Sequence, residues 1–116
     1  MPLVSVLIPA LDAGHTVRAA VESMLDCDLA RAGEVQVVVA PDDGSMQYDA
    51  CMRGLRGVLV LEPTHRVGPG PSRTRARQAA AGAWLTLLDA DDLVSSGYLD
   101  DLVDLAQRTG AACVFS

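Results

Sequence analysis

The sequence contains no lysine, and its aromatic side chains are few: one Trp, two Tyr and one Phe in 116 residues. With so few rings, the core must be built from Val, Leu, Ile and Ala, a composition typical of buried parallel strands covered by alanine-rich helices. The net charge is −6, which argues against a broad basic surface for nucleic acid. The nine cations are all arginines, and four of them lie within twelve residues: Arg66, Arg73, Arg75 and Arg77. Guanidinium groups match phosphate geometry, so a small anionic ligand is indicated, although each arginine could equally lie on a solvated helix face.

Cysteine is also scarce, and Cys27, Cys51 and Cys113 show no CxxC or histidine-rich spacing. Neither a zinc site nor a disulfide framework is indicated, and we expect reduced, mostly buried thiols. No apolar run approaches the ~18 residues of a membrane span, and no basic region precedes the first apolar run. We therefore expect no membrane span in this segment and a cytoplasmic protein, either free or at the cytoplasmic face of the membrane.

Short strands and helices alternate along the chain. Strands are predicted at Leu3–Ile8 (closed by Pro9), Val35–Val39, Val58–Leu61, Trp84–Leu88 and Ala112–Phe115. Helices are predicted at Thr16–Leu25, 46–54, Ser72–Ala81 and from Ser95 or Ser96 to Thr109, with Glu62–Pro71 as a loop. This alternation predicts one α/β domain of three layers (α/β/α) with a mainly parallel sheet. The continuous apolar run Trp84–Leu88 predicts a strand buried on both faces, and Asp100 and Asp101 are expected to complement the dipole of the last helix.

Three polar segments follow predicted strands, and the carboxyl ends of parallel strands share one edge of a sheet, where ligands collect. They are Pro9–Asp12, Asp42–Ser45 and Asp89–Asp92. The third holds three carboxylates in four residues, which repel by roughly 4 kcal/mol per close pair at an intermediate dielectric. A divalent cation would relieve this repulsion, and oxygen ligands favour Mg²⁺ or Mn²⁺ over zinc. The alternative is that these aspartates only cap the next helix.

Asp42 and Asp43 end the second strand, where a carboxylate could accept the N3–H of uracil or the N1–H of guanine. An ordinary Asp-Gly turn is the equally weighted alternative. Arg73 could bind a phosphate in bidentate fashion near a helix N-terminus. His15 and His65 are assigned no role.

Taken together, these segments resemble the N-terminal half of the family-two glycosyltransferases of the GT-A fold. The family's S-V-I-I-P-A-x-N stretch is matched by Ser5 to Asp12, and its V-D-D-G-S by Pro41 to Ser45. Its G-P-x-x-A-R-N is matched loosely by Gly70 to Thr74, and its A-x-G-x-(apolar)₅-D-A-D-D closely by Ala80 to Asp92. Leu11 stands where the family usually has an aromatic residue, Asp12 and Thr74 where it has Asn.

The resemblance implies a donor-binding role for this segment. Asp43 would contact the base, and Pro9, Ala10 and Leu11 would line the pocket for base and ribose. Asp91 would coordinate a Mn²⁺ or Mg²⁺ ion on the diphosphate, while Asp89 or Asp92 would hold the ribose or the sugar and Arg73 would approach the phosphates. The substrate-binding set is Pro9, Ala10, Leu11, Asp12, Asp42, Asp43, Arg73, Asp89 and Asp92.

By the same resemblance, the chain would take a nucleotide-diphosphate sugar, with UDP favoured by family frequency, and transfer the sugar with inversion to a hydroxyl of a glycan or lipid-linked acceptor. Residues 1–116 would be the donor-binding part of a truncated domain, since the family's general base and acceptor site lie beyond residue 116. No catalytic residue is therefore expected in this chain. The main alternative is a non-catalytic nucleotide-binding module of the same fold. An aspartate-nucleophile phosphatase or a receiver domain would need a late lysine, and a dinucleotide-binding module a glycine-rich turn after the first strand.

Overall fold

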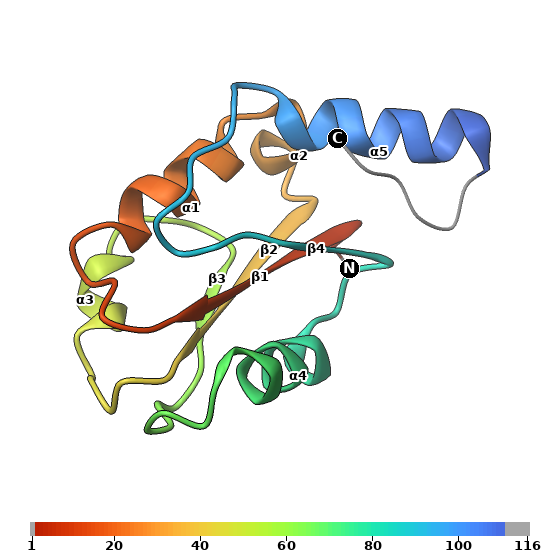
Figure 1. Cartoon of the computed structure of the whole chain (residues 1–116). Coiled ribbons are helices and arrows are strands. Elements are labelled where there is room, and N and C mark those ends of the chain that lie inside the picture. The colour runs from red at the N-terminus through yellow and green to blue at the C-terminus, as the bar shows by residue number, and fades with distance from the viewer. Residues whose placement is uncertain (1, 111–116) are drawn as a thin grey trace.

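The computed structural model describes residues 2–110, which form a parallel sheet with helices on both of its faces (Figure 1). The described sheet has the strand order β3-β2-β1-β4, and each neighbouring pair is parallel. The strands are β1 (Val4–Ala10), β2 (Val35–Pro41), β3 (Val58–Val60) and β4 (Trp84–Leu87). The helices are α1 (Val17–Leu25), α2 (Asp28–Arg31), α3 (Tyr48–Cys51), α4 (Pro69–Ala79) and α5 (Tyr98–Thr109). The α/β class with a parallel sheet is confirmed, whereas the strand predicted at Ala112–Phe115 lies outside the described residues.

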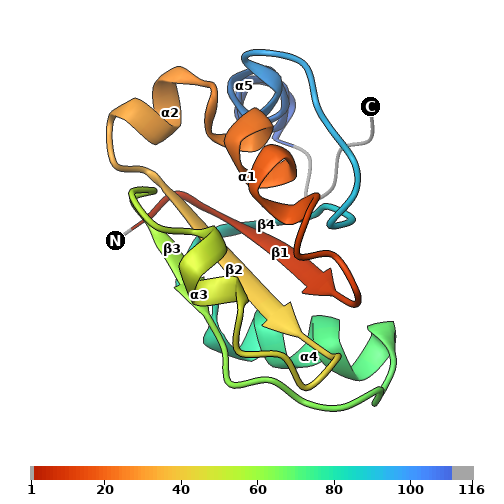
Figure 2. The same cartoon turned by 90° about the vertical axis from the view of Figure 1, so that its left-hand side faces the viewer.

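Alternate residues of the central strands enter two separate apolar clusters. Val6, Ile8 and Val37 pack in the larger cluster with residues of α1, α3 and α5. Leu7 and Val38 face the opposite side of the sheet and pack with Ala76 of α4. Figure 2 shows α4 on one side of the sheet and α1, α2 and α5 on the other. This arrangement leaves the carboxyl ends of the strands free to receive the loops that carry the polar segments.

Several boundaries differ from the predicted ones, and proline and glycine account for them. Helix α4 begins at Pro69 instead of Ser72, because proline is compatible with the first turn of a helix, where no N–H donor is needed. Strand β1 continues through Pro9, which pairs in register with Ala40, since proline removes a donor without preventing extended backbone. Helix α5 follows Gly97, which has a left-handed φ of 76°, so neither predicted serine caps it.

The prediction that the strand at Trp84–Leu88, which corresponds to β4, is buried on both faces is wrong. In β4, Leu85 is 46% exposed and Leu87 is 56% exposed. A continuous apolar run implies two covered faces only for an interior strand. Here β4 is at the edge of the described sheet, and α4 packs over Leu7 and Val38 of the central strands instead.

A partly buried network of hydrogen bonds fixes the start of β4 against β1. The Ser5 hydroxyl donates to Gln36 Oε1 at 2.8 Å, and the Gly82 N–H donates to Ser5 Oγ at 2.9 Å. The Ala81 N–H donates to the same Gln36 oxygen at 2.9 Å. A Cβ atom at Gly82 would lie 2.6 Å from the backbone nitrogen of Ser5, closer than real contacts allow. Glycine is therefore required at this position, where the backbone before β4 comes close to the backbone of β1.

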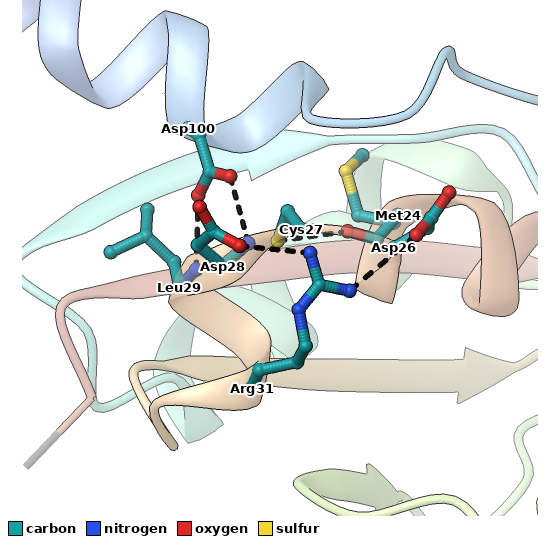
Figure 3. A network of polar contacts seen from close by, with 7 residues as sticks. All are labelled: Met24, Asp26, Cys27, Asp28, Leu29, Arg31 and Asp100. Carbon is teal, nitrogen blue, oxygen red and sulfur yellow. Dashed lines mark hydrogen bonds and ion pairs between the residues drawn. The ribbon is translucent and has the colours of Figure 1, made fainter.

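The segment after β4 is anchored at its far end by α2, a short helix that the sequence did not reveal. Asp100 of α5 accepts hydrogen bonds from the N–H groups of Asp28 at 2.8 Å and Leu29 at 2.9 Å (Figure 3). The Gly97 N–H also donates to the Asp26 carbonyl at 2.8 Å. Asp100 and Asp101 lie in the first turn of α5, as expected, and the carboxylate of Asp100 also caps the N-terminus of α2.

The two described cysteines are free; Cys27 is buried, as expected, whereas Cys51 is only half-buried. Burial raises the pKa of the Cys27 thiol. Within residues 2–110, none of the helices has the length and apolar character needed to cross a bilayer.

Candidate functional site

A cleft of about 600 Å³ opens at the carboxyl edge of the sheet. Its walls come from the end of β1, the turn after β2, the loop before α4, the first turns of α4 and the turn after β4. The residues that line it are Pro9, Ala10, Leu11, Asp12, Ala13, His15, Thr16, Asp42, Arg66, Gly68, Pro69, Ser72, Arg73, Asp89, Ala90 and Asp91. The predicted convergence of the three polar segments at one edge is thus confirmed.

Asp42 is a buried carboxylate, 4% exposed, and it organises the loop before α4. Its Oδ1 accepts from the Thr64 hydroxyl at 2.6 Å and the Val67 N–H at 2.9 Å, and its Oδ2 accepts from the Gly68 N–H at 2.8 Å. Burial by itself would raise the pKa of Asp42, but these hydrogen bonds together outweigh burial and lower the pKa. Asp42 therefore stays ionised and fixes the wall of the cleft that leads into α4.

Asp43 connects the turn after β2 to the turn after β1. Its Oδ2 accepts from the Tyr48 hydroxyl at 2.6 Å and the Asp12 N–H at 2.9 Å, and its Oδ1 accepts from the Ser45 N–H at 3.0 Å. Burial opposes ionisation of Asp43, yet the bonds from Tyr48, Ser45 and Asp12 lower its pKa. Burial, and next the bond to Asp43, raise the pKa of Tyr48 to about 12, so the phenol remains a donor.

The turn after β4 presents its carboxylates to solvent. Asp89 lies 3.8 Å from Arg73 Nη2 across the cleft, an ion pair that is partly exposed on both sides. Asp91 lines the cleft, and its carboxylate makes no hydrogen bond and no ion pair with any of the described residues. Asp92 does not line the cleft but an adjoining hollow of about 320 Å³, which shares Asp89 with it. Nowhere in residues 2–110 do three or more His, Cys, Asp or Glu side chains converge as a metal cage.

Three buried side-chain atoms of α4 lack partners, namely Ser72 Oγ, Arg73 Nε and Arg75 Nη1, and the first two belong to residues that line the cleft. Ser72 is fully buried and its Oγ makes no hydrogen bond, and the Nε of Arg73 is likewise buried without an acceptor. Buried donors without partners are costly, about 1–3 kcal/mol each. Both residues line the cleft near the N-terminus of α4, where backbone N–H groups and the helix dipole favour an anion. An acceptor-rich ligand would supply what these donors lack.

Most of the predicted site residues therefore line one cleft: Pro9, Ala10, Leu11, Asp12, Asp42, Arg73, Asp89 and Asp91. Asp43 and Asp92 lie beside it and do not line it. Sequence reasoning missed Ser72, Thr16, His15 and Arg66. Arg66 belonged to the arginine cluster noted in the sequence, and that was the one available signal, because only the fold brings its loop to the end of β1.

Comparison with known proteins identifies the class. A model described as Glycosyl transferase family 2 matches residues 5–116, so the chain belongs to this family. The solved structure of S. aureus TarS 1-349 superposes with a TM-score of 0.77 at 24% identity, over 91% of this chain and 32% of that one. The same fragment solved in complex with UDP-GlcNAc gives a TM-score of 0.78. The architecture is thus that of the GT-A glycosyltransferases.

Curated relatives give a more particular likeness. The succinoglycan biosynthesis protein ExoO of Rhizobium meliloti is 32% identical over 96% of this chain. A GalNAc(5)-diNAcBac-PP-undecaprenol beta-1,3-glucosyltransferase of Campylobacter jejuni is 27% identical over 99% of the chain. The chain covers only 32% and 38% of the lengths of these two relatives.

Proposed function

We propose that this chain is the donor-binding part of a glycosyltransferase that takes a sugar from a nucleotide-diphosphate sugar, with UDP as the favoured nucleotide. One observation carries the proposal: the cleft joins apolar surface from Pro9–Leu11, arginine and unpartnered donors at α4, and an unpaired carboxylate at Asp91. These are the groups that a base, a diphosphate and a diphosphate-bound cation require. Structural neighbours include a TarS fragment in complex with UDP.

Asp91 is the residue proposed to hold a Mn²⁺ or Mg²⁺ ion. Hard cations of this kind take oxygen ligands, and Mg²⁺ commonly uses one or two carboxylates and completes its shell with phosphate oxygens and water. A single free carboxylate at the cleft fits that chemistry, and a closed cage of three protein ligands is not needed. When bound, the ion would stabilise the charge of the departing diphosphate.

Arg73 and the first turns of α4 are proposed to bind the diphosphate. Arg73 pairs with Asp89 at 3.8 Å, a contact too long and too exposed to hold the guanidinium strongly. A phosphate oxygen could replace Asp89 on Arg73 and at the same time accept from Arg73 Nε. Asp89 would then be released toward the ribose or the sugar.

The reaction proposed for the whole enzyme is an inverting displacement. An acceptor hydroxyl attacks the anomeric carbon, the bond from this carbon to the diphosphate oxygen breaks, and the hydroxyl proton passes to a general base. The acceptor would be a glycan or a lipid-linked sugar, as in polysaccharide biosynthesis, to which the relative ExoO is assigned by name. The general base and the acceptor site are proposed to belong to a part of the enzyme outside residues 1–116.

Base recognition by Asp43 is also part of the proposal. Its Oδ1 accepts one hydrogen bond from Ser45, which leaves acceptor capacity for the N3–H of uracil. The variant Asp43→Ala should reduce the preference for UDP over CDP, measured by calorimetry with both nucleotides. Equal loss for the two nucleotides would assign Asp43 to the support of the cleft alone.

A module that binds a nucleotide without turnover would use the same cleft. One observation is compatible with it: among the described cleft carboxylates only Asp91 has no partner, so this cleft offers a metal ligand but no general base of its own. Calorimetry of the chain with UDP, with and without Mn²⁺, tests donor binding. Binding that requires Mn²⁺ supports the proposal, and no binding of UDP under either condition refutes it. Sugar release from common donors by the longer enzyme would separate a transferase from a binding module.

A further inference from the structure

Two non-glycine residues in residues 2–110 have left-handed backbone, and they face each other at the cleft. Asp12 has a φ of 52° and Arg66 a φ of 55°. Their side chains meet with Arg66 Nη2 3.4 Å from Asp12 Oδ2, and both residues line the cleft. Left-handed backbone costs an L-residue roughly 1–2 kcal/mol, and such positions gather at ligand-binding sites.

The turn after β2 holds both strained residues in place. The Arg66 N–H donates to the Asp42 carbonyl at 2.7 Å, while the Asp12 N–H donates to the Asp43 carboxylate at 2.9 Å. Asp42 further fixes the residues that follow Arg66, through the N–H groups of Val67 and Gly68. The direction in which Arg66 leaves the backbone is therefore determined by several independent contacts.

Stability does not account for this arrangement. The Arg66 and Asp12 side chains are 60% and 69% exposed, and an ion pair so exposed adds little to folding. Glycine at position 66 would remove the backbone strain and lose only this weak contact. The guanidinium is thus held at the cleft at some cost to the fold, and that cost requires another explanation.

The lining of the cleft supplies one. None of the described lining residues is Phe, Tyr or Trp, and the imidazole of His15 is the one aromatic ring among them. The apolar surface at the end of β1 ends in Leu11, which is 47% exposed. A nucleobase bound there would have no Phe, Tyr or Trp side chain on which to stack. The guanidinium of Arg66 is planar, weakly hydrated and able to stack on an aromatic face. Arg73 lies instead at the α4 side of the cleft, beside Asp89, where it is proposed to bind the diphosphate.

We propose that Arg66 is the stacking surface for the nucleobase of the donor, held in position by its ion pair with Asp12. The inference rests on the proposed function, because it needs a nucleotide in this cleft. It adds a residue and a mode of contact: the base lies between the apolar end of β1 and a guanidinium plane. Any nucleobase could stack on this guanidinium, so Arg66 would increase the affinity for every nucleotide, whereas Asp43 would provide selectivity for the base.

The test compares the binding of uridine and UDP by the parent chain and three variants. Arg66→Lys keeps the charge and the ion pair but loses the plane, and it should weaken both ligands by about fivefold, in keeping with an exposed stacking or cation–π contact. Arg56→Lys is the matched control, since Arg56 is exposed and does not line the cleft, and it should leave both affinities unchanged. Arg66→Gly should bind both ligands more weakly than the parent chain while its thermal midpoint stays equal or rises, which a purely structural role for Arg66 would not produce.

The other outcomes are equally clear. If Arg66→Lys leaves uridine binding unchanged and only UDP weakens in Arg66→Gly, then Arg66 contacts a phosphate and the stacking proposal is wrong. If both ligands bind all three variants as well as the parent, Arg66 has no part in the site. If the parent chain binds neither UDP nor uridine, the proposed function fails first and this inference fails with it.

Discussion

The two acidic turns at the edge of the sheet look alike in sequence and differ in what their carboxylates do. After β2, Asp42 and Asp43 each accept three hydrogen bonds from the protein. After β4, Asp89 has one long ion pair and Asp91 has no side-chain partner among the described residues. The first turn therefore builds the cleft, whereas the second is available to a ligand. Substitution of Asp42 should therefore affect stability and substitution of Asp91 should affect binding, whereas Asp43, which keeps acceptor capacity for a base, should affect both.

The largest effect is expected for Asp91→Asn. If this carboxylate is the metal ligand, its loss should reduce Mn²⁺-dependent binding of UDP by more than about 100-fold, because Mg²⁺-like cations bind few protein groups and depend on each. The free energy of unfolding should change by less than about 0.5 kcal/mol, as at other exposed positions. Calorimetry and chemical denaturation measure the two quantities. Unchanged UDP affinity at saturating Mn²⁺ would show that the metal, if there is one, is held elsewhere, and Asp49→Asn, an exposed change outside the cleft, controls for loss of charge.

Asp42→Asn should show the opposite pattern. The amide has one acceptor oxygen where the carboxylate has two, so the N–H of Gly68 would face an NH₂ group and lose its acceptor. We expect the free energy of unfolding to fall by roughly 2–3 kcal/mol, the cost of breaking bonds to a buried charge. A loss as small as that of Asp91→Asn would remove the contrast between the two turns.

A smaller loss is expected for Tyr48→Phe. The phenol is fully buried, donates to Asp43 at 2.6 Å and accepts from the Ala13 N–H at 3.1 Å. Without the hydroxyl, both partners are left unsatisfied, and stability should fall by about 1–2 kcal/mol. Denaturation by urea gives this value, and an unchanged midpoint would mean that water can replace the hydroxyl.

The smallest effect concerns pH. The pKa values of Asp42 and Asp43 are lowered in the folded chain, so their contribution to stability is complete above the unfolded value of about 4. As pH falls from there through the lower folded pKa values, the unfolded state takes up protons first and this stability is lost. Thermal midpoints should therefore fall more steeply below about pH 4 in the parent chain than in Asp42→Asn. Parallel curves for the two chains would show that Asp42 is not the group that titrates.

The sequence predicted the elements that depend on a strong local pattern. Helix α1 was read from apolar residues at offsets of three and four, and the structure has it at Val17–Leu25 with Val17, Ala20, Val21 and Met24 buried. Helix α2 has only four residues, too few for any period, and it depends on a capping carboxylate from α5. The burial of β4 could not be predicted because an edge strand and a central strand can have the same apolar run.

The site was predictable where the argument was topological. Strand ends in a parallel sheet meet at one edge, so the convergence of the three polar segments followed from their order alone. The separate roles of the two acidic turns did not follow, because hydrogen bonds to Asp42 come from Thr64, Val67 and Gly68 in a loop with no regular pattern. Arg66 was missed for the same reason, since its place beside Asp12 depends on that loop.

Gly82 does not line the cleft, yet a substitution at this position should change the geometry of the cleft. A methyl group at this position would collide with the backbone of Ser5, and β4 would have to move away from β1 to accommodate it. Asp89 and Asp91 follow directly from β4, so their carboxylates would move too, although neither residue had been changed. A search for inactivating substitutions that examined only the residues lining the cleft would therefore overlook Gly82.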